Sequence, residues 1–203
     1  FLESPIFLQM YDIVRNADTL LDLQSDSKES RLQSISRPKV SLHLKDAMNK
    51  MEGTRYFSED LFSDMKKNSD LLKEIAAIIK GEFLFEKELR DFVFQKKHNG
   101  GSKNIQVRAA NTASGIKSFG MIQLLVQAGF VDRRSLLIID EPETHLHPKW
   151  QVEYARLLVA LVKAEIPVLL TSHSPYMVQA LKVFSEKEGI ADLTNFYLAE
   201  KEP

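Results

Sequence analysis

Short apolar runs alternate with longer amphipathic stretches over residues 110–199, and this alternation limits the possible folds more than any other feature. The run "SLLIID" (135–140) has no polar side chain between its first and last residues, as expected of a strand buried on both faces. A helical pattern over 148–164 separates it from a second apolar run at 167–171. We therefore predict an α/β fold, a parallel sheet flanked by helices. Further elements are expected as helices over 115–129 and 175–187 and a strand over 195–199.

The residues before 110 show different patterns. Three alternating segments with a turn at 98–101 predict a small antiparallel meander, with strands over 82–86, 91–97 and 104–109. Helical patterns cover 4–23, 41–52 and 69–80, the last with Ser69 as its expected cap, and a polar linker covers 24–39. We divide the chain into a helical arm or lid region over 1–80 and a C-terminal lobe over 81–203.

Composition excludes several classes of protein. Hydrophobic residues make up 44% and charged residues 27%, as in globular domains with a core. No cysteine is present, which excludes disulfides and thiolate metal sites. No apolar run approaches the roughly 20 residues that span a bilayer, and no secretory signal follows Phe1, so we expect a cytoplasmic protein. The first residue is not Met, which favours a fragment of a longer protein. A net charge of -1 gives no support to nucleic-acid binding.

Two expected strand ends carry acidic and imidazole side chains. Asp140 and Glu141 follow the first buried strand, and adjacent strand residues point to opposite faces, so their tasks should differ. One can reach a magnesium-bound water, while the other can face an attacking water as general base. His173 follows the next strand, one strand–helix–strand crossover later. The alternative is a solvated acidic turn and a structural histidine.

Ser114 and Gly115 begin an expected helix whose free N–H groups favour an anion. The neighbouring Lys117-Ser118 does not form a phosphate-binding loop, because that loop needs Gly, four residues and then Gly-Lys-Ser/Thr. No such sequence occurs in the 203 residues. We therefore expect this chain alone to hydrolyse ATP no faster than background.

Together these motifs resemble the C-terminal half of an ABC-type, P-loop NTPase-like ATPase cassette. The chain is most similar to bacterial AAA ATPases related to the overcoming-lysogenisation-defect (OLD) proteins and to ATPases of Septu- and retron-type phage-defence systems. The resemblance rests on four stretches: "FLESP" (1–5), "NTASGIKS" (111–118), "DEPETHLHP" (140–148) and "TSHSP" (171–175). It implies that the missing phosphate loop lies in an upstream part of the intact protein.

The resemblance also implies roles for single residues. Asp140 matches the aspartate that holds Mg²⁺ through water, Glu141 the general base, and His173 the switch histidine at the γ-phosphate of ATP. Ser114 and Gly115 match the signature that completes the nucleotide site of the opposite subunit in a homodimer. Lys117 stands in this signature, where it could contact a phosphate or be solvated. The loop that crosses the dimer interface is matched by Glu143, Thr144, His145, Leu146 and His147.

The family's partners are implied only in outline: a nuclease or another effector protein. Two alternatives to an ATPase remain open at this point. The first is a metal-dependent hydrolase with Asp140, Glu143, His145 and His147 as ligands. The second is a non-catalytic interaction domain that has kept the motif without its chemistry.

Overall fold

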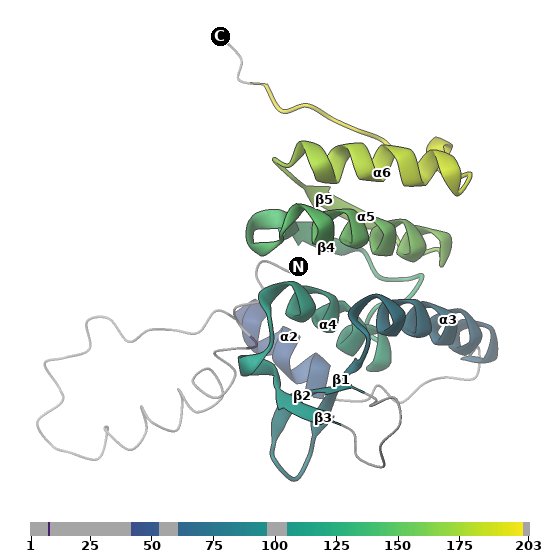
Figure 1. Cartoon of the computed structure of the whole chain (residues 1–203). Coiled ribbons are helices and arrows are strands. Elements are labelled where there is room, and N and C mark those ends of the chain that lie inside the picture. Colours follow the sequence, from purple (N-terminus) through teal and green to yellow (C-terminus); the bar gives the residue numbers. More distant parts are fainter. Residues whose placement is uncertain (1–7, 9–41, 53–60, 97–104, 201–203) are drawn as a thin grey trace, which may run out of the picture.

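The computed structural model describes Leu8 and residues 42–52, 61–96 and 105–200. In Figure 1 the described elements form two stacked parts that share one hydrophobic core. One part contains three helices and a three-stranded sheet, and the other contains two helices and a two-stranded sheet. Apart from Leu8, the predictions for residues 1–5, 4–23, 24–39 and 98–101 lie outside the described residues.

The predicted meander is confirmed. Strands β1 (Glu82–Glu86), β2 (Asp91–Lys96) and β3 (Ile105–Arg108) pair antiparallel in the order β1-β2-β3. Phenylalanines face each other across β1 and β2, with ring centroids 5.2 Å apart for Phe83 and Phe94 and 5.1 Å apart for Phe85 and Phe92. Such aromatic pairs between strands stabilise the sheet and fix its register.

Three helices accompany this sheet: α2 (Leu42–Glu52), α3 (Leu61–Ile79) and α4 (Ser114–Gln127). Helix α4 is buried along nearly its whole length, which explains why its sequence is apolar on most sides. Helix α3 begins earlier than predicted, so Ser69 lies inside it and cannot be its N-cap. The residues before Ser69 include good helix formers and neither Gly nor Pro, so the helix extends through them.

The second part contains the predicted strand–helix–strand unit. Strands β4 (Leu137–Asp140) and β5 (Val168–Thr171) are parallel, with Asp140 opposite Thr171. Helix α5 (Pro148–Lys163) connects them, and α6 (Pro175–Lys187) follows β5. Both helices begin with proline after a side-chain cap, His147 for α5 and Ser174 for α6.

The β4–β5 sheet is covered on one face, which corrects the expectation that β4 is buried on both. Leu137 and Ile139 face the core and are 4% and 2% exposed. On the opposite face Leu136 is 58% exposed and Leu169 is 54% exposed. The apolar sequence of β4 predicts that both faces of the sheet are covered. No described element covers the face that carries Leu136 and Leu169.

The predicted strand over 195–199 does not form. Residues 194–200 have no regular structure, and in Figure 1 this segment runs away from α6 towards the C-terminal end. Tyr197 is 91% exposed. Apolar and aromatic residues favour a strand only where a neighbouring strand offers its backbone, and no described strand does so here. Among the described helices, none has the length and apolar character needed to cross a membrane.

Candidate functional site

The carboxyl ends of β4 and β5 bring the predicted acidic residues together. Asp140 lies opposite Thr171 in the sheet, and the Thr171 hydroxyl donates a hydrogen bond to Asp140 Oδ1. The Glu141 amide donates to the Thr171 carbonyl at 3.2 Å and to its hydroxyl oxygen at 3.1 Å. Thr171 therefore fixes the backbone of one acidic residue and the side chain of the other.

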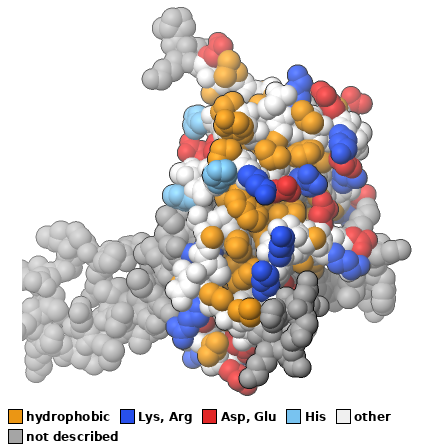
Figure 2. Space-filling model, viewed as in Figure 1, with side chains coloured by type: hydrophobic (Ala, Val, Ile, Leu, Met, Phe, Trp, Pro, Cys, Tyr) orange, Lys and Arg blue, Asp and Glu red, His pale blue; other side chains and the backbone are white. Residues whose placement is uncertain are grey.

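Glu141 and His173 meet at this edge of the sheet. The His173 Nε2 atom lies 2.9 Å from Glu141 Oε1, an ion pair when the imidazole is protonated. The side chains remain accessible, His173 at 86% and Glu141 at 46% exposure. Figure 2 shows histidine and acidic side chains gathered along the left edge of this face, in its upper part. The pair can therefore meet a ligand from solvent.

Backbone geometry separates the two adjacent carboxylates. Glu141 has φ 41° and ψ 55°, a left-handed conformation that is uncommon for a residue with a side chain. The chain turns there from β4 into a short 3-10 helix, Pro142–His145. Positions of this kind are retained where surrounding contacts hold them, and the two hydrogen bonds to Thr171 do so here.

The loop after β4 contains the five residues that the resemblance places at a dimer interface. Leu146 is buried in the core, while Thr144, His145 and His147 are exposed. Thr144 Oγ1 donates to the Glu141 carbonyl at 2.9 Å, and His147 Nδ1 accepts from the Lys149 amide at 3.3 Å. Thr144 and His147 thus bond to neighbouring backbone groups of the same loop. His145 lies between them in the sequence and is exposed.

Glu143 differs from the other members of this loop, because its carboxylate points towards the residues around His173. Its Oε1 atom accepts hydrogen bonds from Ser172 Oγ at 2.7 Å, the His173 amide at 2.6 Å and the Ser174 amide at 3.1 Å. The expected place of Glu143 was the crossing to a second subunit. Its Oε1 atom bonds to the turn after β5, and its place at the interface between two subunits stays a prediction.

Ser114 and Gly115 begin α4 as predicted, but Ser114 is not the N-cap. That position belongs to Ala113, and no side chain caps the helix. The Ser114 hydroxyl instead donates to the His145 carbonyl at 3.1 Å, which joins the start of α4 to the loop after β4. The N–H groups at this helix start therefore have no side-chain acceptor, as an anion site requires.

The burial of Lys117 contradicts both expectations for its side chain, contact with a phosphate and exposure to solvent. Lys117 is 0% exposed, so it is neither solvated nor placed to contact a phosphate. Its Nζ atom donates to the Ala110 carbonyl at 3.1 Å. Burial lowers the pKa of this lysine, because removal from water disfavours the charged form. Lys117 thus holds the turn that precedes Ser114 and Gly115.

The metal-hydrolase alternative finds no support in this geometry. Within the described part of the chain, no three or more His, Cys, Asp and Glu side chains gather into a group that could hold a metal ion. Asp140, Glu143, His145 and His147 all lie in that part. Glu143 is occupied by the residues around His173, and His147 caps α5.

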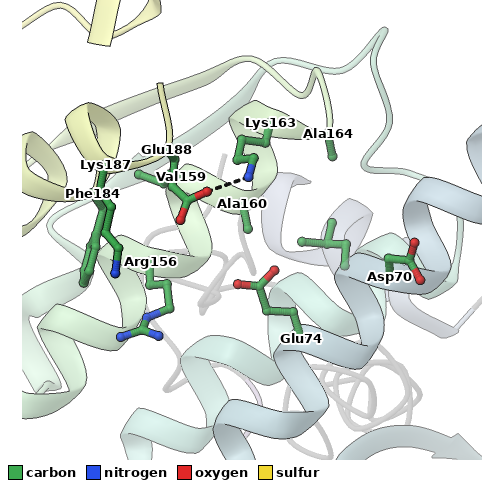
Figure 3. A pocket seen from close by; sticks show the side chains of 11 residues that line it. Asp70, Glu74, Arg156, Val159, Ala160, Lys163, Ala164, Phe184, Lys187 and Glu188 are labelled. Carbon is green, nitrogen blue, oxygen red and sulfur yellow. Dashed lines mark hydrogen bonds and ion pairs between the residues drawn. The ribbon is translucent and has the colours of Figure 1, made fainter. Parts of the chain in front are cut away.

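A groove of about 350 Å³ lies away from this edge, between α3, α5 and α6 (Figure 3). Charges of both signs line it, and several are neutralised by neighbours. Lys163 Nζ lies 2.6 Å from Glu188 Oε2, and Arg156 stacks 5.1 Å from the ring centroid of Phe184. The pair of charges raises the pKa of Lys163 and lowers that of Glu188. Three acidic and three basic side chains line the groove, so it has no net charge to select a ligand.

Four residues of the site were not assigned a role from the sequence: Thr171, Ser172, Ser174 and Gln151. Three of them belong to "TSHSP", in which Thr171 is the last residue of β5 and Ser172 and Ser174 follow it. Small hydroxyl residues at such ends commonly bond to nearby backbone or carboxylates, and that is the signal which could have found them. Gln151 carries no such signal, because its role depends on the packing of α5 against the loop.

Comparison with known proteins identifies the family. A family model described as AAA ATPase domain matches residues 9–178. The Septu protein PtuA of Bacillus thuringiensis is 40% identical over 55 residues, which are 26% of this chain and 13% of that protein. A Smc head domain from Pyrococcus furiosus, solved with an extended coiled coil and bound to the C-terminal domain of ScpA, superposes with a TM-score of 0.38 and 13% identity, over 85% of this chain and 46% of that one. The family match covers most of the sequence, and the chain belongs to the AAA ATPase domain family.

Proposed function

We propose that this chain supplies the magnesium, general-base and switch residues of an ATP-hydrolysing site that is completed when two subunits associate head to tail. One observation carries the proposal. The ends of two adjacent parallel strands bring Asp140, Glu141 and His173 to one accessible edge, with Glu141 and His173 2.9 Å apart. Ligands of open α/β sheets bind at this edge.

Asp140 fits a magnesium ion held together with a nucleotide. Magnesium in such sites keeps several waters and uses one or two carboxylates plus the substrate phosphates, so a multi-residue protein cage is not required. Asp140 is exposed, and Thr171 orients its carboxylate by a hydrogen bond. Bound magnesium would neutralise phosphate charge.

Glu141 and His173 would divide the remaining tasks. In the structure His173 Nε2 lies within hydrogen-bond distance of Glu141 Oε1. An exposed pair of this kind contributes only about 0–1 kcal/mol, so a γ-phosphate oxygen can take over the imidazole at little cost. His173 then donates to the phosphate, and Glu141 Oε1 is free to accept a proton from the attacking water.

The phosphates need further donors than this chain provides. No phosphate-loop sequence occurs in the 203 residues, and the exposed sheet face with Leu136 and Leu169 lies beside Asp140. We propose that the segment with the phosphate loop covers this face. The uncapped start of α4 at Ser114 and Gly115 would meet the γ-phosphate bound by the opposite subunit.

The chain spans 13% of the length of the Septu protein, so the biological role is also a proposal. The identity of 40% over 55 residues supports a part in phage defence, in which ATP-driven closure of a homodimer controls an effector protein such as a nuclease.

Glu141→Gln in the intact protein tests the proposed function. The amide keeps the shape of the side chain and removes the base, so ATP hydrolysis should fall by about 10²–10⁴-fold while ATP binding persists. Glu186→Gln, at an exposed carboxylate of α6, is the matched control and should hydrolyse ATP at the wild-type rate. Turnover by Glu141→Gln at the wild-type rate would refute the assigned role. An intact wild-type protein that binds ATP without hydrolysing it would favour the non-catalytic alternative.

A further inference from the structure

We infer that Glu143 is a positioning residue that holds the His173 backbone within its own subunit. The catalytic consequence of this inference rests on the proposed function. Three donors converge on Glu143 Oε1, from Ser172, His173 and Ser174 at 2.7, 2.6 and 3.1 Å. They come from three consecutive residues, so a single carboxylate oxygen fixes the whole turn between β5 and α6.

A carboxylate suits this position for two reasons. Bonds from N–H and O–H groups to a charged acceptor are shorter and stronger than bonds to a neutral one, and two of the three here are 2.6 and 2.7 Å long. The negative charge also lies beside Ser174, the N-cap residue of α6, a helix of 13 residues whose dipole favours an anion at this end. Glu143 therefore stabilises both the turn and the start of the helix.

A second contact holds the same turn from the side of α5. Ser174 Oγ donates to Gln151 Oε1 at 2.5 Å, and Gln151 Nε2 donates to the Leu146 carbonyl at 2.9 Å. Ser174 and Gln151 are each 8% exposed, so solvent competes little for these bonds. The turn that contains His173 is thus held by Glu143 and Gln151, two residues of the segment that follows β4, while the imidazole stays accessible.

The backbone of His173 is held by a hydrogen bond, while its exposed side chain can rotate. The imidazole can exchange Glu141 for a phosphate by rotating its side chain, because its backbone amide remains bonded to Glu143. The two oxygens of the Glu143 carboxylate differ in their surroundings. Oε1 carries three bonds, and Oε2 is buried without a hydrogen-bond partner among the described residues. Glu143 Oε1 therefore serves the turn of its own chain that contains His173.

Hydrogen exchange tests the positioning role without reference to ATP. In the intact protein, the His173 amide should exchange about 10-fold faster or more in Glu143→Ala, because it loses a charged acceptor. Glu143→Gln keeps an oxygen at the same place and should restore most of the protection. Glu186→Ala, which removes an exposed carboxylate of α6, should exchange at the wild-type rate. Equal exchange at His173 in Glu143→Ala and in the wild type would overturn the inference.

ATP turnover supplies the second test, with a double-mutant cycle. Glu143→Ala should lower kcat by about 10–100-fold, as loss of an orienting side chain typically does, with a smaller change in KM. Glu143→Gln should recover most of the rate. In a His173→Ala background, Glu143→Ala should cost little more, because both changes remove the same function. A full and equal loss in both backgrounds would show that Glu143 does not act through His173.

The outcomes separate this inference from the proposed function. If Glu141→Gln hydrolyses ATP normally, the proposed function fails, while the exchange result at His173 still decides the role of Glu143. If Glu141→Gln is inactive and Glu143→Ala keeps the wild-type kcat and the wild-type exchange rate, only the inference fails. Should Glu143→Ala not fold, as judged by its thermal unfolding, the comparison is made with Glu143→Asp. Its shorter side chain withdraws the acceptor, so faster exchange at His173 is expected and wild-type exchange again overturns the inference.

Discussion

Lys117 is a buried lysine with one hydrogen-bond acceptor among the described residues, the Ala110 carbonyl at 3.1 Å. An ammonium group has three donors, and burial with one partner disfavours its charged form. Desolvation accordingly lowers the pKa of Lys117 from its usual 10.5. The lysine also lies in the first turn of α4, where the helix dipole opposes a positive charge. The charged form of Lys117 is therefore disfavoured in the folded state, while its hydrogen bond favours folding.

The pH dependence of stability follows from this lowered pKa. Between the folded pKa and about 10.5 the unfolded chain binds more protons than the folded one, so the free energy of unfolding rises with pH. In Lys117→Met this contribution is absent. The stability of the wild type relative to Lys117→Met should therefore increase with pH between the lowered pKa of the folded state and about 10.5, as measured by denaturant unfolding. Lys182→Met, at an exposed lysine of α6, is the control and should show no such trend. A constant difference for Lys117→Met would contradict the prediction.

Gly120 determines how closely α4 approaches the three-stranded sheet. A Cβ atom at this position would lie 2.3 Å from Phe83 Cδ2. The Phe83 ring is fully buried and packs against Phe94, so it has no room to move aside. Gly120→Ala should therefore destabilise the protein by about 1–3 kcal/mol, the usual cost of overpacking a core.

Urea unfolding measures this effect, with Gly115→Ala as the matched control in the same helix. At Gly115 the nearest atom to an added Cβ is Leu146 Cδ2 at 3.4 Å, which is ordinary contact. Alanine there should be neutral or stabilising by up to about 1 kcal/mol, since it lowers the entropy cost of the helix. Equal stability of Gly120→Ala and the wild type would show that α4 and β1 can separate without cost.

At the scale of elements, the sequence predicted the features that depend on residues close together in the chain, such as the starts of helices. The helices predicted over 148–164 and 175–187 begin where α5 and α6 begin, each at a proline that follows a capping residue. The prediction of a strand over 195–199 was wrong, because a strand forms only beside a pairing strand and local sequence does not reveal that partner. The prediction that the Lys117 side chain is solvated or contacts a phosphate was wrong for a related reason, since its burial depends on how α4 packs and not on its own residue type. The Asp140, Glu141 and His173 cluster was predictable because adjacent parallel strands bring their carboxyl ends together.

At the scale of the whole molecule, α4 couples the two stacked parts. Its Phe119 ring contacts Trp150 and Tyr154 of α5 edge to face, with centroids 5.5 and 5.2 Å apart. Its first residue, Ser114, bonds to the His145 carbonyl in the loop after β4. The start of α4 and the loop with Glu143 are therefore held in one arrangement. A nucleotide that binds the helix start from a second subunit would contact the same rigid unit that positions His173.

The head-to-tail dimer makes a prediction at this largest scale. Ser114→Arg in the intact protein places a long side chain at the start of α4, where the nucleotide of the opposite subunit is proposed to bind. It should block ATP-dependent dimerisation and turnover, while the affinity of a single subunit for ATP stays close to that of the wild type. Light scattering with and without ATP, run beside turnover on the same samples, measures both.

Ser114→Ala is the control, because it removes the same hydroxyl bond to His145 without adding bulk. That bond contributes about 0.5–1.5 kcal/mol, so the alanine protein should lose some stability and still dimerise. A result in which both variants fail to dimerise would assign the defect to the loop contact and not to the interface. Normal dimerisation and turnover by Ser114→Arg would remove the helix start from the nucleotide site, and the head-to-tail arrangement would lose its central contact.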